Sequence, residues 1–145
     1  MLQIPTSIVP LFLRAGWQPP AQPRETPSAE SAEAYAATVI AEFGGLQVGA
    51  TGAGRDLAAS DVSFYCEPQQ DVASLVEQWS SQVGNLAAVA SAHHDHMVVF
   101  VDANGRFYAF TDPDDRLYLI GRSLGEAMER LLLGFGYGAP IPRGA

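Results

Sequence analysis

The strongest constraint on the fold of this chain is a pair of apolar runs separated by an Asn-Gly dipeptide. The runs are Val98–Val101 and Phe107–Phe110, and Asn104-Gly105 lies between them. Asn-Gly between such runs is the strongest short-range signal for a hairpin closed by a two-residue type I′ turn. Both turn residues then need positive φ, which Asn tolerates and Gly adopts freely. The sequence therefore predicts an antiparallel hairpin that turns at Asn104-Gly105.

Other segments also have the periodicity of strands. Val62, Phe64 and Cys66 alternate with polar neighbours, which predicts a half-buried strand with Cys66 as a small buried side chain. Strands are predicted over residues 46–48, 62–66, 86–90, 97–102, 106–111 and 117–121. Residues 112–115, Asp-Pro-Asp-Asp, supply the turn between the last two strands.

Apolar spacing and capping residues predict helices over residues 7–15, 26–43 and 71–83, and a last one that begins after residue 123. Thr26 can cap the second helix, and Pro27 suits its first turn. Asp71 can cap the third helix. Ser123 and Glu126 have the spacing of a capping box.

Helices at the N-terminal, middle and C-terminal positions around an antiparallel sheet of five to six strands define an α+β fold. With 145 residues and no internal repeat, the chain is predicted to form one domain over 1–145. We expect residues 1–6 and the Gly- and Pro-rich residues 135–145 to be frayed.

The composition is acidic and limits the possible partners. The net charge is −8, and all eight basic residues are Arg. Binding to nucleic acid relies on clustered cations, so the sequence argues against nucleic acid as a direct partner. The charge favours a cationic partner, although it would equally keep a protein soluble.

Cysteine content and hydropathy bear on the compartment. A single Cys excludes an intrachain disulfide. No signal peptide is evident at the N-terminus, and the longest apolar run, Met97–Val101, is too short to span a membrane. We therefore expect a cytoplasmic protein without a membrane partner.

His93-His94-Asp95-His96 is the segment that most resembles a reactive site, because imidazoles and carboxylates bind Zn²⁺. Neighbouring residues diverge in a strand or loop, however, so the spacing favours a polar turn over a metal site. Residues 49–55 are Gly-rich, but a phosphate-binding loop of the Walker type needs a Lys that this chain lacks. We predict no catalytic residue, no cofactor and no metal.

Binding to a partner is the remaining interpretation. Asp112, Asp114 and Asp115 form a candidate anionic patch, which Tyr108 and Tyr118 on the flanking strands could supplement with aromatic anchors. Trp17 lies in a Pro-rich connector and is a further candidate anchor.

Several short motifs, taken in order, resemble one known family over about residues 11–134. They are Ala15-Gly16-Trp17 with Pro23-Arg24 nearby, Glu42-Phe43-Gly44-Gly45-Leu46, Gly105-Arg106-Phe107-Tyr108, and the closing helix around Ser123-Leu124-Gly125-Glu126. This order resembles the SUKH superfamily, and within it the third family of bacterial SUKH immunity proteins. Phe107 stands where that family often has an aliphatic residue, which is a harmless change on a strand face.

The resemblance implies a small cytoplasmic antitoxin that binds and blocks the catalytic domain of a cognate polymorphic toxin. It assigns no catalytic residues. Toxin partners in the superfamily include nucleases and nucleic-acid deaminases, whose substrate-binding surfaces are cationic. Two other functions stay open: a regulatory or scaffold module that binds a host protein, and a small metal-dependent hydrolase built around His93–His96 and Cys66. The sequence makes no prediction about the oligomeric state.

Overall fold

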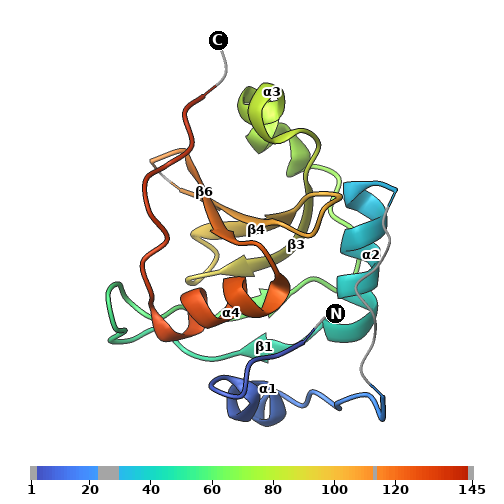
Figure 1. Ribbon diagram of the computed structural model, residues 1–145, viewed down its shortest axis with the longest axis vertical. Coiled ribbons are helices and arrows are strands. Elements are labelled where there is room, and N and C mark those ends of the chain that lie inside the picture. Colours follow the sequence, from blue (N-terminus) through green and yellow to red (C-terminus); the bar gives the residue numbers. More distant parts are fainter. Residues whose placement is uncertain (1–2, 23–29, 113, 144–145) are drawn as a thin grey trace.

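The computed structural model describes residues 3–22, 30–112 and 114–143 (Figure 1). A six-stranded sheet in the order β1-β2-β3-β4-β5-β6 forms its centre, and each strand pairs antiparallel with its neighbour in sequence. The strands are β1 (Gln47–Val48), β2 (Val62–Phe64), β3 (Ala87–Ala92), β4 (Met97–Val101), β5 (Phe107–Thr111) and β6 (Arg116–Gly121). The predicted antiparallel sheet is confirmed.

Four α-helices and one 3₁₀ helix flank this sheet among the described residues. They are α1 (Val9–Arg14), α2 (Ala32–Phe43), the 3₁₀ helix η1 (Ala73–Trp79), α3 (Ser80–Val83) and α4 (Leu124–Leu133). The α+β class is therefore confirmed. No helix in the described part of the chain is both long and apolar enough to cross a membrane.

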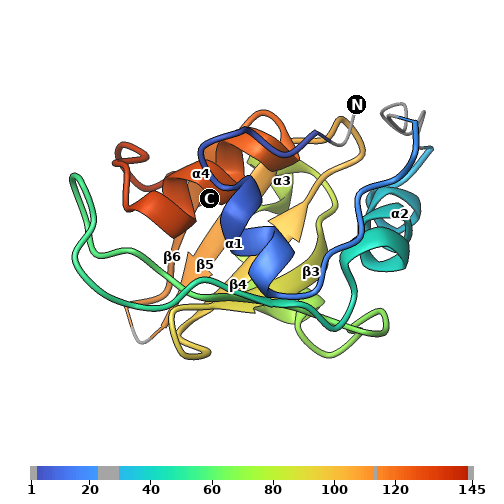
Figure 2. The ribbon, with the colours of Figure 1, turned by 90° about the horizontal axis from the view of Figure 1, so that it is seen from below.

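Each face of the sheet packs against its own hydrophobic cluster, as expected for alternating strands buried on both sides. Val99 and Val101 of β4 face a cluster that also holds buried residues of α1, α2 and α4. Phe100, between them, faces a second cluster with Trp79 of η1. Figure 1 shows α3 on one side of the sheet and α1 with α4 on the other, and Figure 2 shows α1, α2 and α4 from below.

The predicted hairpin is present, but its turn is not the two-residue type. The N–H of Asp102 donates to the carbonyl of Arg106 over 3.0 Å, so Ala103, Asn104 and Gly105 form a three-residue loop. Only Gly105 among these three has positive φ, at 83°. This is a type I turn followed by a left-handed glycine, the usual three-residue hairpin. The buried Asp102 carboxylate favours it, because Oδ1 accepts the N–H groups of both Asn104 and Arg106.

Two helix starts also differ from the sequence prediction. Helix α2 begins after Ser31, whose Oγ accepts the N–H of Ala34 over 3.0 Å. The predicted cap Thr26 and Pro27 lie outside the described residues. The segment that follows Asp71 is mainly 3₁₀ rather than α, and no side chain caps it. The apolar spacing of this segment does not separate the two helix types.

Cys66 is exposed, and the prediction that it is buried is wrong. Strand β2 ends at Phe64, so the alternation that would bury residue 66 stops before reaching it. Two residues near the ends of the described chain make contacts with its body. Ile4 packs against the first cluster, and the N–H of Ile141 donates to the carbonyl of Leu117 on β6 over 2.7 Å.

Candidate partner-binding surface

Four segments meet at one end of the sheet, and we call them together the turn edge. They are residues 49–61, residues 93–96, the turn residues 112, 114 and 115, and residues 134–143. The strand register brings them together, because Val62 pairs with both Val48 and Ala92. Met97 in turn pairs with both Ala92 and Thr111. Both ribbon views place these four segments at the left side of the molecule (Figures 1 and 2).

The histidine segment forms the tight turn between β3 and β4. His93, His94 and Asp95 all have positive φ, at 53°, 53° and 67°. Such a conformation is costly for residues other than Gly and must be held by its surroundings. The carbonyl and the carboxylate Oδ1 of Asp61 hold it by accepting the backbone N–H groups of His93 and His94, each over 3.0 Å.

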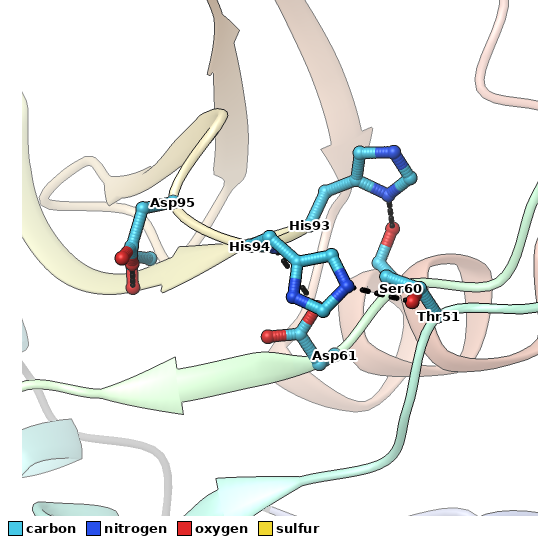
Figure 3. Close-up of polar contacts among 7 residues, drawn as sticks. Thr51, Ser60, Asp61, His93, His94 and Asp95 are labelled. Atoms are coloured by element: carbon cyan, nitrogen blue, oxygen red, sulfur yellow. Dashed lines mark hydrogen bonds and ion pairs between the residues drawn. The ribbon is translucent and has the colours of Figure 1, made fainter.

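The side chains of this turn point in different directions (Figure 3). Nδ1 of His93 lies 3.3 Å from Oγ of the buried Ser60, while Nε2 of His94 lies 2.8 Å from Oγ1 of Thr51. The carboxylate of Asp95 turns away and accepts from Ser91. Within the described residues, no three His, Cys, Asp or Glu side chains converge as a metal site requires.

The three aspartates of the 112–115 turn are exposed, as a recognition patch requires. Oγ1 of Thr111 donates to the carboxylate of Asp114 over 2.6 Å, and Nε of Arg116 lies 3.9 Å from the same carboxylate. The N–H of Asp112 donates to the carbonyl of His96 over 2.9 Å. This bond joins the acidic turn to the histidine turn.

The aromatic candidates lie in unlike environments. Tyr108 is only 3% exposed, and its hydroxyl donates to the buried Asp102 carboxylate over 3.4 Å. Its burial, and then the negative charge of Asp102, raise the pKa of Tyr108 above its ordinary value. Tyr118 is half-buried and packs edge-on against Tyr137, with 5.1 Å between the ring centres. Of these two tyrosines, Tyr118 is the one with substantial exposed surface beside the turn edge.

Trp17 packs against the aromatic residues of the first cluster rather than standing free. Its ring stacks on Phe43 at 6.1 Å and meets Phe12 edge-on at 5.9 Å. The indole Nε1 is buried and has no hydrogen-bond acceptor among the described residues. These ring contacts place Trp17 against helices α1 and α2.

A cavity of about 190 Å³ lies at the turn edge, and no pattern in the sequence predicts it. Its walls include Leu57, Met97, Phe135 and Tyr137, with His93 and Arg130 as polar members. The cavity forms where the 49–61 loop lies against the end of α4. Backbone N–H groups of Arg55, Asp56, Leu57 and Ser60 donate to the last carbonyls of this helix region, over 2.7 to 3.0 Å. The loop thus satisfies carbonyls that a helix end leaves unpaired.

The fold and this surface define the class of protein: a small α+β domain with exposed carboxylates at one end of its sheet, in which no group of three His, Cys, Asp or Glu side chains converges on a metal site among the described residues. The chain matches the model of the SUKH-3 immunity protein family over residues 5–134. It therefore belongs to the SUKH-3 immunity protein family, and this membership implies binding to a cognate toxin protein. Comparison with curated proteins and with solved structures gives no significant match.

Proposed function

We propose that this protein is a cytoplasmic immunity protein that neutralises a cognate polymorphic toxin by binding it one to one and masking its active site, with no chemistry of its own. The single observation that carries the proposal is the turn edge, where exposed carboxylates gather at one end of the sheet in a member of an immunity family. Asp112, Asp114 and Asp115 are the residues we place at the contact, with Tyr118 beside them.

The charge of the protein supports a cationic toxin. A net charge of −8 steers association with a positively charged partner and disfavours direct contact with nucleic acid. Nucleases and nucleic-acid deaminases must present a cationic surface to phosphates, so an acidic protein can occupy that surface in place of the substrate. We therefore propose a toxin of this kind.

The test is titration of the purified protein into the toxin domain encoded by the neighbouring gene, followed by calorimetry and by the toxin's own activity assay. We expect a 1:1 complex, loss of toxin activity at equivalence, and an interface of about 1,600 Å² in total. Affinity should fall as salt rises, because rim charges are screened. A toxin that stays fully active in excess protein would contradict the proposal.

A further inference from the structure

The cavity at the turn edge is open, apolar and bordered by an exposed leucine. Leu57, which is 44% exposed, lines it together with Phe135 and Tyr137. A single exposed leucine is ordinary on a protein surface and does not by itself indicate a binding site. Beside an unfilled apolar cavity, however, it extends a surface that a partner side chain can cover. An engineered protein cavity of about 150 Å³ accommodates benzene, so a cavity of about 190 Å³ has room for one aromatic or branched aliphatic side chain.

The acidic turn lies beside this cavity, on the same face of the sheet. Met97, which lines the cavity, pairs with Thr111, and directly paired residues of antiparallel strands point to the same face. Thr111 then fixes the Asp114 carboxylate with a hydrogen bond of 2.6 Å. The pKa of Tyr137, which lines the cavity, is raised by burial, by Tyr118 and by the negative charge of Asp114.

The guanidinium groups near the cavity already have partners. Arg55 lies over the Phe135 ring at 5.6 Å, and Arg130 pairs with Glu126 at 3.3 Å. The four segments of the turn edge carry six aspartates against two arginines. The turn edge is therefore negative overall, even when Arg130 of the cavity lining is added to this count, and a second copy of this chain would bring the same charges against it. This argues for a cationic partner and against self-association.

We propose that this cavity is the socket for one large apolar side chain of the toxin, carried on a segment with Lys or Arg on both sides. The inference rests on the proposed immunity function and adds the location of the anchor and the chemistry of the partner segment. The buried apolar side chain holds the complex together, and the aspartates of the turn edge speed its formation.

The first test compares two leucines with similar exposure on different faces. Leu57→Ser removes an apolar side chain from the lining of the socket, whereas Leu75→Ser changes a leucine on η1 that is 38% exposed. We expect the Kd for the toxin domain to rise about tenfold or more for Leu57→Ser and to stay within about twofold for Leu75→Ser. Ala58→Trp, which adds a large ring at an exposed residue of the cavity lining, should weaken binding similarly. Equal affinities for all variants and the wild type would overturn the socket.

The second test does not need the toxin. The peptide Lys-Lys-Phe-Lys-Lys is titrated into the isotope-labelled protein, with Lys-Lys-Ser-Lys-Lys and Glu-Glu-Phe-Glu-Glu as controls. We expect only the first peptide to shift the NMR signals of Leu57, Met97 and Tyr137, and Leu57→Ser to reduce these shifts. Absent shifts, or equal shifts with all three peptides, would overturn the inference. Failure of the wild-type protein to bind the toxin would instead overturn the immunity function, and the peptides would still decide whether the socket has this specificity.

Discussion

The hydroxyl of Tyr35 on helix α2 lies over the turn glycine, Gly105, of the β4–β5 hairpin. A Cβ atom at Gly105 would stand 2.8 Å from the Tyr35 hydroxyl oxygen and 3.0 Å from its ring carbon Cζ. Gly105 also has φ of 83°, where side chains are strained. Two independent constraints therefore require glycine at this position, and the hairpin turn is tied to α2 by the same contact.

Gly105→Val should consequently destabilise the protein by more than about 1 kcal/mol, because valine resists positive φ and would collide with Tyr35. The measurement is the free energy of unfolding in denaturant. Gly138→Val is the matched control, since Gly138 has φ of 82° but a Cβ atom there would meet nothing within 4 Å. This control variant introduces backbone strain without a collision, so it should lower the free energy of unfolding by less than Gly105→Val does. Equal losses for the two variants would show that the Tyr35 contact contributes nothing.

The loop–helix junction at the turn edge depends on a second close approach. A Cβ atom at Gly54 would lie 2.1 Å from the carbonyl oxygen of Leu57 and 2.8 Å from Cα of Gly134. Gly54→Ala should therefore lower the free energy of unfolding by about 1–3 kcal/mol, as overpacking does, and it should loosen residues 49–61. Gly52→Ala, where the added carbon meets nothing within 4 Å, should be nearly neutral. Thermal unfolding and proteolysis of the loop measure both effects, and unchanged proteolysis in Gly54→Ala would refute the junction.

Two tyrosines near Asp102 predict sensitivity to alkaline pH. Burial and the Asp102 charge raise the pKa of Tyr35 and of Tyr108 above the ordinary 10.0. Above pH 10 the folded state then holds more protons than the unfolded state, so the free energy of unfolding falls as pH rises. Below pH 10 this contribution is constant. Tyr108→Phe should make the alkaline decline shallower, and Asp102→Asn should do so only in part, because burial is the larger cause. A decline identical in all three proteins would exclude this origin.

We predict that the histidine turn does not hold a metal ion. Its rings diverge toward Ser60 and Thr51, and no three ligands converge within the described residues. Elemental analysis of the purified protein should find zinc far below one equivalent, both in the wild type and after His94→Ala with His96→Ala. Stoichiometric zinc that disappears in the double variant would establish a metal site.

The central strands were predictable because the continuous apolar runs along 97–101 and 107–110 are a local property, typical of strands that are buried on both faces. The turn type was not, because Asn-Gly suits both a two-residue turn and the three-residue turn observed. The choice depends on Asp102, whose carboxylate accepts two backbone N–H groups once it is buried. The predicted α-helix over 71–83 was wrong, because the apolar spacing of this segment suits an α-helix and a 3₁₀ helix equally. Asp71 also provides no side-chain cap.

The acidic part of the candidate surface could be identified from sequence, whereas the cavity could not. Asp112, Asp114 and Asp115 are close together in the chain, so their exposure follows from local turn chemistry. The cavity walls come from residues as far apart as Leu57 and Tyr137, and only the packing of a loop against the end of α4 brings them together. An aliphatic residue in a Gly-rich loop and two aromatic residues in a Gly-rich tail were the available signals.

The rate at which the complex forms should depend on the acidic turn. Changing Asp112, Asp114 and Asp115 together to Asn removes three exposed charges while keeping the size of each side chain. Because rim charges act mainly on the encounter, association with the neighbouring toxin domain should slow and its dependence on salt should flatten. The dissociation rate and the free energy of unfolding should change little, apart from the Thr111–Asp114 hydrogen bond.

Tyr118→Ala is the complementary variant. Tyr118 supports Tyr137, which lines the cavity, so its loss should speed dissociation and leave association nearly unchanged. Surface-binding kinetics at two or more salt concentrations separate these effects. The matched control is a triple change of Glu67, Asp71 and Glu77 to Gln, Asn and Gln, which removes the same charge from another part of the surface. If this control slows association as much as the turn variant does, the overall charge of the protein rather than the turn edge directs the encounter.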